Sequence, residues 1–310
     1  MNTLSSINFS AKNDPLGFIT CSEERYHNEI KSLAEKILNN EKYKIVLLAG
    51  PSGSGKTTTA HILKEYLFNI GLSAQVVSLD NFYLSTDKMP RLSNGQPDFE
   101  TVYSLDIAEI YRCFSQIISV GKTDMPIFNF SKKSREEKLH TIDVSKGGII
   151  IVEGLHALNP ILYEKLPSDS LLKVYISVND YVTHNSKKLL SSRKMRLARR
   201  LSRDYIYRNT TPMQTLKLWT SVVEGEEKYL YCFKDTADLV IKTFHMYEPC
   251  VFRDVVYTLL KDLPETAENY NYAIELREAL LRFEAISVQL VPENSLLREF
   301  ISGGRFENSK

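Results

Sequence analysis

The chain has 310 residues, of which 43% are hydrophobic and 25% charged, a composition ordinary for a globular protein with a sizeable core. Its 39 Lys and Arg nearly balance 38 Asp and Glu, so no global field draws it to nucleic acid or to an anionic membrane. Four scattered cysteines form no C-x-x-C pair, and neither a signal peptide nor an apolar run of about 18 residues occurs. We expect a cytoplasmic protein that binds neither nucleic acid nor membranes.

The predicted elements alternate between helix and strand. Residues 1–42 form an N-terminal extension with a helix at 23–39, followed by a short apolar strand at 43–49 and a helix at 57–68. The pattern continues with strands at 74–79, 148–153, 172–178 and 237–242 and a helix at 107–120. Continuously apolar strands are typical of a parallel sheet covered on both faces. We predict an α/β fold with a doubly wound, mostly parallel sheet.

Three regions follow from this pattern. The extension ends at residue 42, and the core covers residues 43–246. A basic segment at about 185–210 forms a lid within the core, and residues 84–101 are a polar, turn-rich loop. Residues 247–310 carry helical patterns and form a C-terminal appendage.

Residues 50–57 read Gly-Pro-Ser-Gly-Ser-Gly-Lys-Thr and fit G-x-x-x-x-G-K-[ST], the P-loop pattern, between a strand and a helix. Glycines let successive N–H groups face phosphate oxygens, and the helix N-terminus adds its positive dipole end. Lys56, which we expect to face solvent without nucleotide, would neutralise phosphate charge, and the Thr57 hydroxyl would ligate Mg²⁺. The predicted ATP-binding residues are Gly50, Ser52, Gly53, Ser54, Gly55, Lys56, Thr57 and Thr58.

Two carboxylates end predicted strands. Glu153 closes an apolar run, where a buried charge is costly unless a cation or N–H groups meet it, so we expect it near Mg²⁺. Asp80 follows the strand at 74–79 and should emerge beside the P-loop. It could orient a substrate hydroxyl and accept its proton, lie at the metal, or simply cap a turn.

Between residues 185 and 208 lie nine Lys or Arg and one acid, Asp204. The arginines at helical spacing share one face of an amphipathic helix, and they are Arg196, Arg199, Arg200 and Arg203. This face needs an anionic partner or open water, and arginine forks suit phosphate. We expect Arg199 to point partly aside, and Lys187 and Lys188 to lie two to four turns upstream.

The segments GPSGSGKTT, SLDNFY, MPIFNFSKKSR, IVEG and RLARRLSRD, in this order, resemble the uridine kinase and phosphoribulokinase family over about residues 44–245. Later segments, among them EGLHALNP and SLLREFISGG, look like a bacterial nucleoside kinase-like branch. The resemblance implies ATP- and Mg²⁺-dependent phosphorylation of a small-molecule hydroxyl, most simply that of a nucleoside. It also implies that Asp80 is the general base and that Glu153 supports Mg²⁺, with Arg200, Arg203 and Arg208 acting from the lid.

The same resemblance implies the residues that contact the acceptor. Glu100 stands where uridine kinases carry an aspartate for the ribose hydroxyls, and Tyr83 and Arg135 match positions near the acceptor. Phe128 and Lys133 replace a Tyr and a His that hydrogen-bond the pyrimidine, which weakens the uridine interpretation. Plain core packing is the alternative for the two phenylalanines of this segment, Phe128 and Phe130.

Other functions stay open at this point. A kinase for a sugar phosphate or a pantothenate-like alcohol would suit the charge of Lys133. A nucleotide-gated regulatory NTPase is a second alternative, whereas the near-neutral charge disfavours an RNA-binding module. The sequence decides neither the acceptor nor the oligomeric state, so a homo-oligomer stays open.

Overall fold

The computed structural model describes residues 2–93 and 95–306. Its helices are α1 (Leu4–Asn13), α2 (Pro15–Leu38), α3 (Lys56–Asn69), α4 (Ile107–Val120), α5 (Ser192–Arg208), α6 (Pro212–Tyr229), α7 (Glu248–Leu260), α8 (Tyr270–Leu280) and α9 (Arg298–Ile301). Its strands are β1 (Ile45–Ala49), β2 (Ala74–Ser78), β3 (Lys122–Met125), β4 (Phe128–Asn129), β5 (Ser134–Arg135), β6 (His140–Asp143), β7 (Ile149–Gly154), β8 (Leu171–Ser177), β9 (Val182–His184), β10 (Lys187–Leu190) and β11 (Leu239–Lys242).

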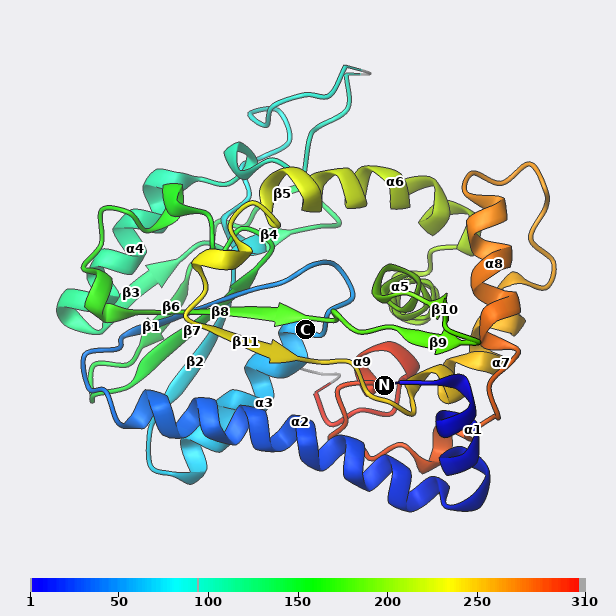
Figure 1. Ribbon diagram of the computed structural model, residues 1–310. Helices are drawn as coiled ribbons and strands as arrows, with labels where there is room; N and C mark the ends of the chain where they lie inside the picture. Colours follow the sequence, from blue (N-terminus) through cyan, green and yellow to red (C-terminus); the bar gives the residue numbers. More distant parts are fainter. Residues whose placement is uncertain (1, 94, 307–310) are drawn as a thin grey trace.

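The predicted parallel sheet is confirmed: five strands lie in the order β11-β8-β1-β7-β2, and every pair is parallel (Figure 1). In the register of β1, β7 and β2, Leu48 pairs with Glu153, and Glu153 pairs with Ser78. Because these strands end at one edge of the sheet, the segments that follow them meet there. The P-loop, Glu153 and Asp80 therefore share one edge.

Alternate side chains of the central strands enter two separate cores. Val46, Leu48 and Ile151 pack into a cluster with α2, α3 and the C-terminal helices. Leu47 and Val152 pack into a second cluster, which contains α4. Figure 1 shows α2 and α3 along one face of the sheet and α4 across the other. This two-sided burial explains why the strands are apolar at every position.

The N-terminal extension and the C-terminal helices share the larger core with the sheet. Its buried members include Ile7 of α1, Ile30 of α2, Phe252 of α7 and Phe300 of α9. Helix α2 begins at Pro15, eight residues before the predicted start of this helix, where the Asp14 side chain caps it by accepting from the Gly17 N–H group. No helix within the described part of the chain is long and apolar enough to cross a membrane.

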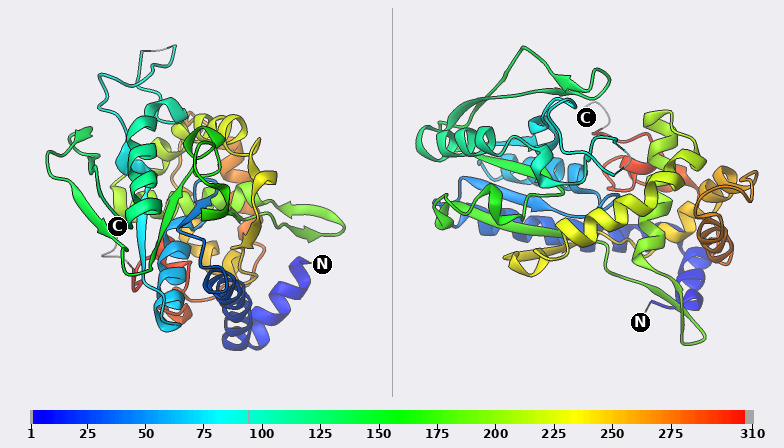
Figure 2. Two further views of the ribbon diagram at one scale, coloured as in Figure 1. Left: turned by 90° about the vertical axis from the view of Figure 1, so that its left-hand side faces the viewer. Right: turned by 90° about the horizontal axis from the view of Figure 1, so that it is seen from above.

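The basic segment is not one helix, as the charge pattern had suggested. Residues 182–190 form the antiparallel hairpin β9–β10, which projects from the body near the N-terminus (Figure 2). Its two turn residues, Asn185 and Ser186, have φ of 49° and 62°, the geometry of a tight hairpin turn. The expectation that Lys187 and Lys188 lie on the helix is therefore wrong, because both belong to β10.

Candidate functional site

The P-loop connects β1 to α3. Gly53 and Gly55 have φ of 72° and 84°, a backbone conformation that glycine adopts without steric cost. Gly55 is the N-cap of α3 and has no side chain that could accept from the first N–H groups of the helix. Since the first N–H groups of a helix have no acceptor within the helix, this end of α3 is suited to bind an anion.

Lys56 is only partly exposed, on the wall of the cleft that the P-loop borders. Its Nζ donates to the Pro51 carbonyl at 3.1 Å, so the side chain folds back over the loop. Burial lowers the pKa of Lys56, and the Glu153 carboxylate is the largest influence in the opposite direction. The lysine is thus held beside the carboxylates at the edge of the sheet.

A cleft of about 200 Å³ lies at this edge. It brings together ten of the predicted residues, which are Ser52, Lys56, Thr57, Asp80, Tyr83, Glu100, Glu153, Arg200, Arg203 and Arg208. Gly154, Leu155, Val222 and Glu226 complete its lining. Four cations and four carboxylates therefore face one small space. The predicted residues Phe128, Phe130, Lys133 and Arg135 do not line it.

The two strand-end carboxylates have different exposure. Glu153 is buried, and burial raises its pKa to about 7, while nearby Lys56 acts to lower it. Asp80 is exposed to the cleft. The surrounding protein desolvates its carboxyl group and raises its pKa, whereas the charge of nearby Lys56 acts to lower it. Each carboxyl group is thereby shifted toward holding a proton.

Asp80, Glu153 and the Thr57 hydroxyl supply the hard oxygen donors that suit Mg²⁺. Within residues 2–93 and 95–306, no group of three His, Cys, Asp or Glu could hold a metal ion by itself. A cation here would need further oxygens from phosphate or water, which is how Mg²⁺ is commonly held at phosphate sites.

Tyr83 and Glu100, which the sequence resemblance placed near the acceptor, also line the cleft. The Tyr83 hydroxyl donates to the Phe99 carbonyl at 2.9 Å. Burial raises the pKa of Glu100 to about 7, with Arg200 opposing this shift. Glu100 also packs closely on α6, because a Cβ at Gly225 would lie 2.9 Å from the Glu100 Cβ. The backbone of α6 thus helps to fix the position of this carboxyl group.

Arg135 lies outside the cleft and holds the loop of residues 79–83 that follows β2. Its guanidinium donates to the backbone carbonyls of Tyr83 and Phe82 at 2.9 Å each. It also forms an ion pair with Asp106 at 3.0 Å. Its polar groups are thus engaged in positioning the segment that follows β2.

An aromatic cluster borders this loop. The ring of Tyr83 makes edge contacts with Phe99, Phe128 and Phe130 at centroid distances of 5.5, 5.6 and 6.3 Å. Phe128 is buried, whereas Phe130 is 57% exposed. Lys133 is exposed on the turn between β4 and β5, with φ of 53°. Of these three predicted residues, Phe130 and Lys133 are therefore the accessible ones.

Three arginines of α5 gather around one acid. Arg200, Arg203 and Arg208 each form an ion pair with Asp204, at 3.1–3.2 Å. Arg200 also donates to the Ser52 hydroxyl of the P-loop at 2.8 Å. The pKa of Arg208 is lowered to about 10, chiefly by Arg203. The guanidinium groups of this corner lie beside the P-loop, where their N–H groups are suited to bind phosphate oxygens.

The other arginines of the predicted basic face are structural. Arg196 pairs with Glu226 at 2.7 Å and Arg199 with Glu248 at 2.6 Å. Arg199 is completely buried and does not line the cleft, so it points away from the P-loop cleft more fully than the partial displacement we expected. The anionic partners that the sequence pattern required are protein carboxylates.

Glu226 is a cleft residue that sequence reasoning missed. It lies on α6, is completely buried and accepts from the Ser52 N–H group at 2.7 Å. The basic face of α5 was a signal that buried carboxylates must lie opposite it. Spacing alone could not select Glu226 among the acids of α6.

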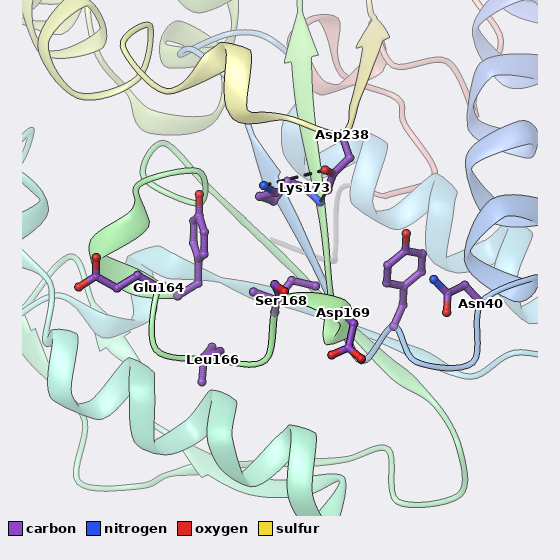
Figure 3. A pocket seen from close by; sticks show the side chains of 10 residues that line it. Asn40, Glu164, Leu166, Ser168, Asp169, Lys173 and Asp238 are labelled. Carbon is purple, nitrogen blue, oxygen red and sulfur yellow. Dashed lines mark hydrogen bonds and ion pairs between the residues drawn. The ribbon is translucent and has the colours of Figure 1, made fainter.

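A second cavity, of about 420 Å³, lies at the opposite edge of the sheet, where β8 and β11 begin (Figure 3). Lys173 lies 3.9 Å from Asp238 there, and Asp169 and Glu164 add further acidic groups. None of the predicted site residues reaches this cavity.

The chain has recognisable relatives. The model of the "Phosphoribulokinase / Uridine kinase family" matches residues 45–248. A uridine kinase of Schizosaccharomyces pombe is 29% identical over 185 residues, which cover 59% of this chain and 36% of that protein. A uridine kinase of Lactobacillus johnsonii is 24% identical over 198 residues, covering 64% of this chain and 85% of that protein. A solved structure, of a possible uridine kinase from Bacillus stearothermophilus, aligns with a TM-score of 0.48 at 17% identity, over 68% of this chain and 98% of that one.

Proposed function

Because the chain belongs to the phosphoribulokinase/uridine kinase family, we propose that it transfers the γ-phosphoryl group of ATP to a hydroxyl group of a nucleoside-like molecule. One observation carries the proposal. The P-loop lysine, two strand-end carboxylates and three arginines line the same cleft. Phosphoryl transfer requires positioning and charge stabilisation more than covalent chemistry from the protein, and these groups can supply both.

Each of these residues has its own role in the proposed reaction. Asp80 orients the acceptor hydroxyl and takes its proton as the oxygen bonds to the γ-phosphorus. The bond between the γ-phosphorus and the bridging oxygen breaks, and ADP leaves with that oxygen. Lys56 and the P-loop N–H groups hold the β- and γ-phosphates, and Arg200, Arg203 and Arg208 stabilise the charge of the transferring group. Mg²⁺, held by Thr57 and Glu153 with Asp80 nearby, would neutralise phosphate charge.

The acceptor site favours a molecule with a flat ring and neighbouring hydroxyl groups. Glu100 can accept from two hydroxyls when ionised, and its pKa of about 7 keeps both forms accessible near neutral pH. The exposed Phe130 ring adjoins Tyr83 and offers a stacking surface beside the cleft. These features support a nucleoside over an acyclic alcohol.

The test is an acceptor panel. Nucleosides, sugar phosphates and pantothenate-like alcohols are each incubated with ATP and Mg²⁺, and ADP release above the acceptor-free background is measured. A nucleoside should give the highest kcat/KM. A preference for sugar phosphates would replace the nucleoside assignment with an anionic acceptor, and ADP release that no acceptor increases would indicate a regulatory NTPase.

The role of Asp80 is tested with Asp80→Asn. Loss of a general base should reduce kcat by about 10²- to 10⁴-fold while ATP affinity changes little. Asp169→Asn, at the opposite edge of the sheet, is the matched control and should keep full activity. A comparable loss of ATP affinity in Asp80→Asn would place this residue at the metal instead.

A further inference from the structure

The C-terminal segment lies along one face of the P-loop helix. Four positions of the P-loop and α3, spaced by three or four residues, contact it, and they are Gly55, Thr58, His61 and Glu65. Their partners are Leu296, Glu299, Phe306 and Arg305, in the same order. Residues 295–306, which we call the C-terminal strap, therefore follow a single helical stripe.

The contacts of the strap are close. A Cβ at Gly55 would lie only 2.4 Å from Leu296 Cδ1, so this side chain packs directly on the P-loop backbone. The rings of His61 and Phe306 stack at 5.7 Å with an interplanar angle of 22°. At its far end, Arg305 forms an ion pair with Glu65 at 3.0 Å, but both side chains are more than one third exposed, so this pair adds little.

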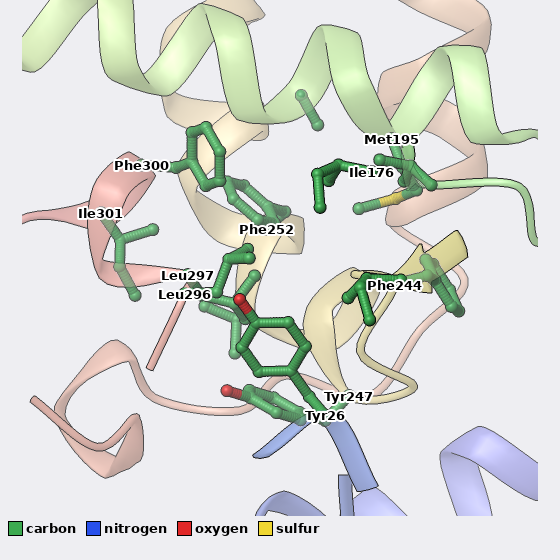
Figure 4. Packing of buried hydrophobic residues seen from close by; sticks show 14 of the residues in the cluster. Tyr26, Ile176, Met195, Phe244, Tyr247, Phe252, Leu296, Leu297, Phe300 and Ile301 are labelled. Carbon is green, nitrogen blue, oxygen red and sulfur yellow. The ribbon is translucent and has the colours of Figure 1, made fainter. Parts of the chain in front are cut away.

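The strap is also anchored away from the P-loop. The Ser295 hydroxyl donates to Glu23 of α2 at 2.6 Å. Leu297 and Phe300 are completely buried and pack in the core with Phe252 and Tyr247 (Figure 4). Opening of residues 298–306 would withdraw the Phe300 ring from this core but can leave the Ser295 anchor in place.

The central contact is electrostatic. Glu299 accepts from the Thr58 hydroxyl at 2.7 Å and from the Thr58 N–H group at 3.3 Å. Thr58 is the third residue of α3, and the backbone hydrogen bonds of the helix begin with the Thr59 N–H group, which donates to the Gly55 carbonyl. The Thr58 N–H group therefore has no acceptor within the helix. Glu299 therefore uses a donor from the set that would cradle the phosphates of a nucleotide.

The charge of Glu299 also reaches the catalytic cleft. It acts to raise the pKa of Lys56 and of Glu153. A phosphate group brought to the start of α3 would meet this buried carboxylate at close range, and like charges at low hydration repel strongly. A phosphate oxygen that accepts from the Thr58 N–H group would therefore compete with Glu299 for this donor.

We propose that Glu299 sets the affinity for the donor nucleotide: it occupies part of the phosphate-binding end of α3 and must leave Thr58 when a nucleotide binds. The inference rests on the proposed use of a nucleotide by this P-loop. It adds that nucleotide binding is coupled to opening of the C-terminal strap. A nucleotide phosphate and the Glu299 carboxylate of the closed strap therefore compete for the hydrogen-bond donors of Thr58.

The first test measures nucleotide binding directly. Glu299→Gln keeps the shape and the acceptor oxygen but removes the charge. ADP, with Mg²⁺, should bind to this variant at least about tenfold more tightly than to the wild type by calorimetry, which corresponds to about 1.4 kcal/mol. Glu293→Gln, an exposed acid just before the strap, is the matched control and should bind ADP as the wild type does. Equal or weaker binding to Glu299→Gln, in a variant that melts like the wild type, would overturn the proposal.

The second test needs no variant. Amide hydrogen exchange of residues 298–306 in the wild type should become faster on saturation with ADP, because the strap opens. Slower exchange would mean that the strap closes over the nucleotide, and unchanged exchange that it stays in place. Either result would contradict the proposal.

The tests also separate this inference from the proposed function. If ADP binds and Glu299→Gln binds it no better, only the coupling fails. If ADP binds but no acceptor is phosphorylated, only the proposed function fails. If neither the wild type nor the variant binds ADP, both fail.

Discussion

Replacing Arg199 tests whether the basic helix is held by buried ion pairs. The Arg199 side chain is completely buried and contacts both oxygens of Glu248, with Nη2 at 2.6 Å and Nε at 3.2 Å. It also donates to the carbonyls of Gly53 and Thr243 at 3.1 and 2.7 Å. Arg199→Met leaves Glu248, itself completely buried, without its cation. Such a loss costs about 3–5 kcal/mol of unfolding free energy.

Urea denaturation followed by circular dichroism measures this cost. The matched control is Arg193→Met on the same helix, because the Arg193 pair with Glu227 is exposed and should contribute only about 0–1 kcal/mol. The double variant Arg199→Met/Glu248→Gln should recover part of the loss, since it no longer buries an unpaired charge. A loss below about 1 kcal/mol for Arg199→Met would refute the reasoning.

Three further predictions concern pH, catalysis and the acceptor. Burial lowers the pKa of His156 to about 4, whereas His in the unfolded chain takes up a proton below about pH 6.5. The free energy of unfolding should therefore fall by about 1.4 kcal/mol for each unit by which the pH drops between these two values. His156→Leu should flatten this part of the plot of stability against pH, measured by denaturation at several pH values. Arg203→Ala should lower kcat about 10²- to 10³-fold more than it weakens ATP binding. Lys187→Ala, on the exposed hairpin, is the control and should leave the steady-state kinetics unchanged. Equal, mild effects of the two substitutions would mean that Arg203 lies on a merely solvated helix. Gly225→Ala places a methyl group against Glu100 and should lower kcat/KM for the acceptor about 10- to 100-fold without changing KM for ATP; an unchanged acceptor kcat/KM would contradict the proposed role of Glu100.

The sequence by itself determined the parts of this protein that depend on short-range patterns. A buried parallel strand is apolar at every position, so the central strands could be located from composition alone. The P-loop could be recognised because its glycines, Lys56 and Thr57 act within eight consecutive residues. Asp80 and Glu153 could be placed together because parallel strands end at one edge of a sheet.

Tertiary structure decided which charges face the cleft and which are buried. Arg199 and Arg200 are neighbours on one helix, yet one is paired with Glu248 in the core and the other reaches Ser52. Helical spacing cannot distinguish them, because the partner is supplied by another element. The hairpin turn at Asn185 and Ser186 similarly overrode the helical charge pattern through local backbone geometry.

The same reason hid the residues that hold the P-loop. Glu226 lies 174 residues from Ser52 along the chain, and Glu299 lies 241 residues from Thr58. Neither carboxylate belongs to a pattern that points to the phosphate site. Each reaches the P-loop only because a distant helix packs beside it, and a pairing of this kind exists only once the chain has folded.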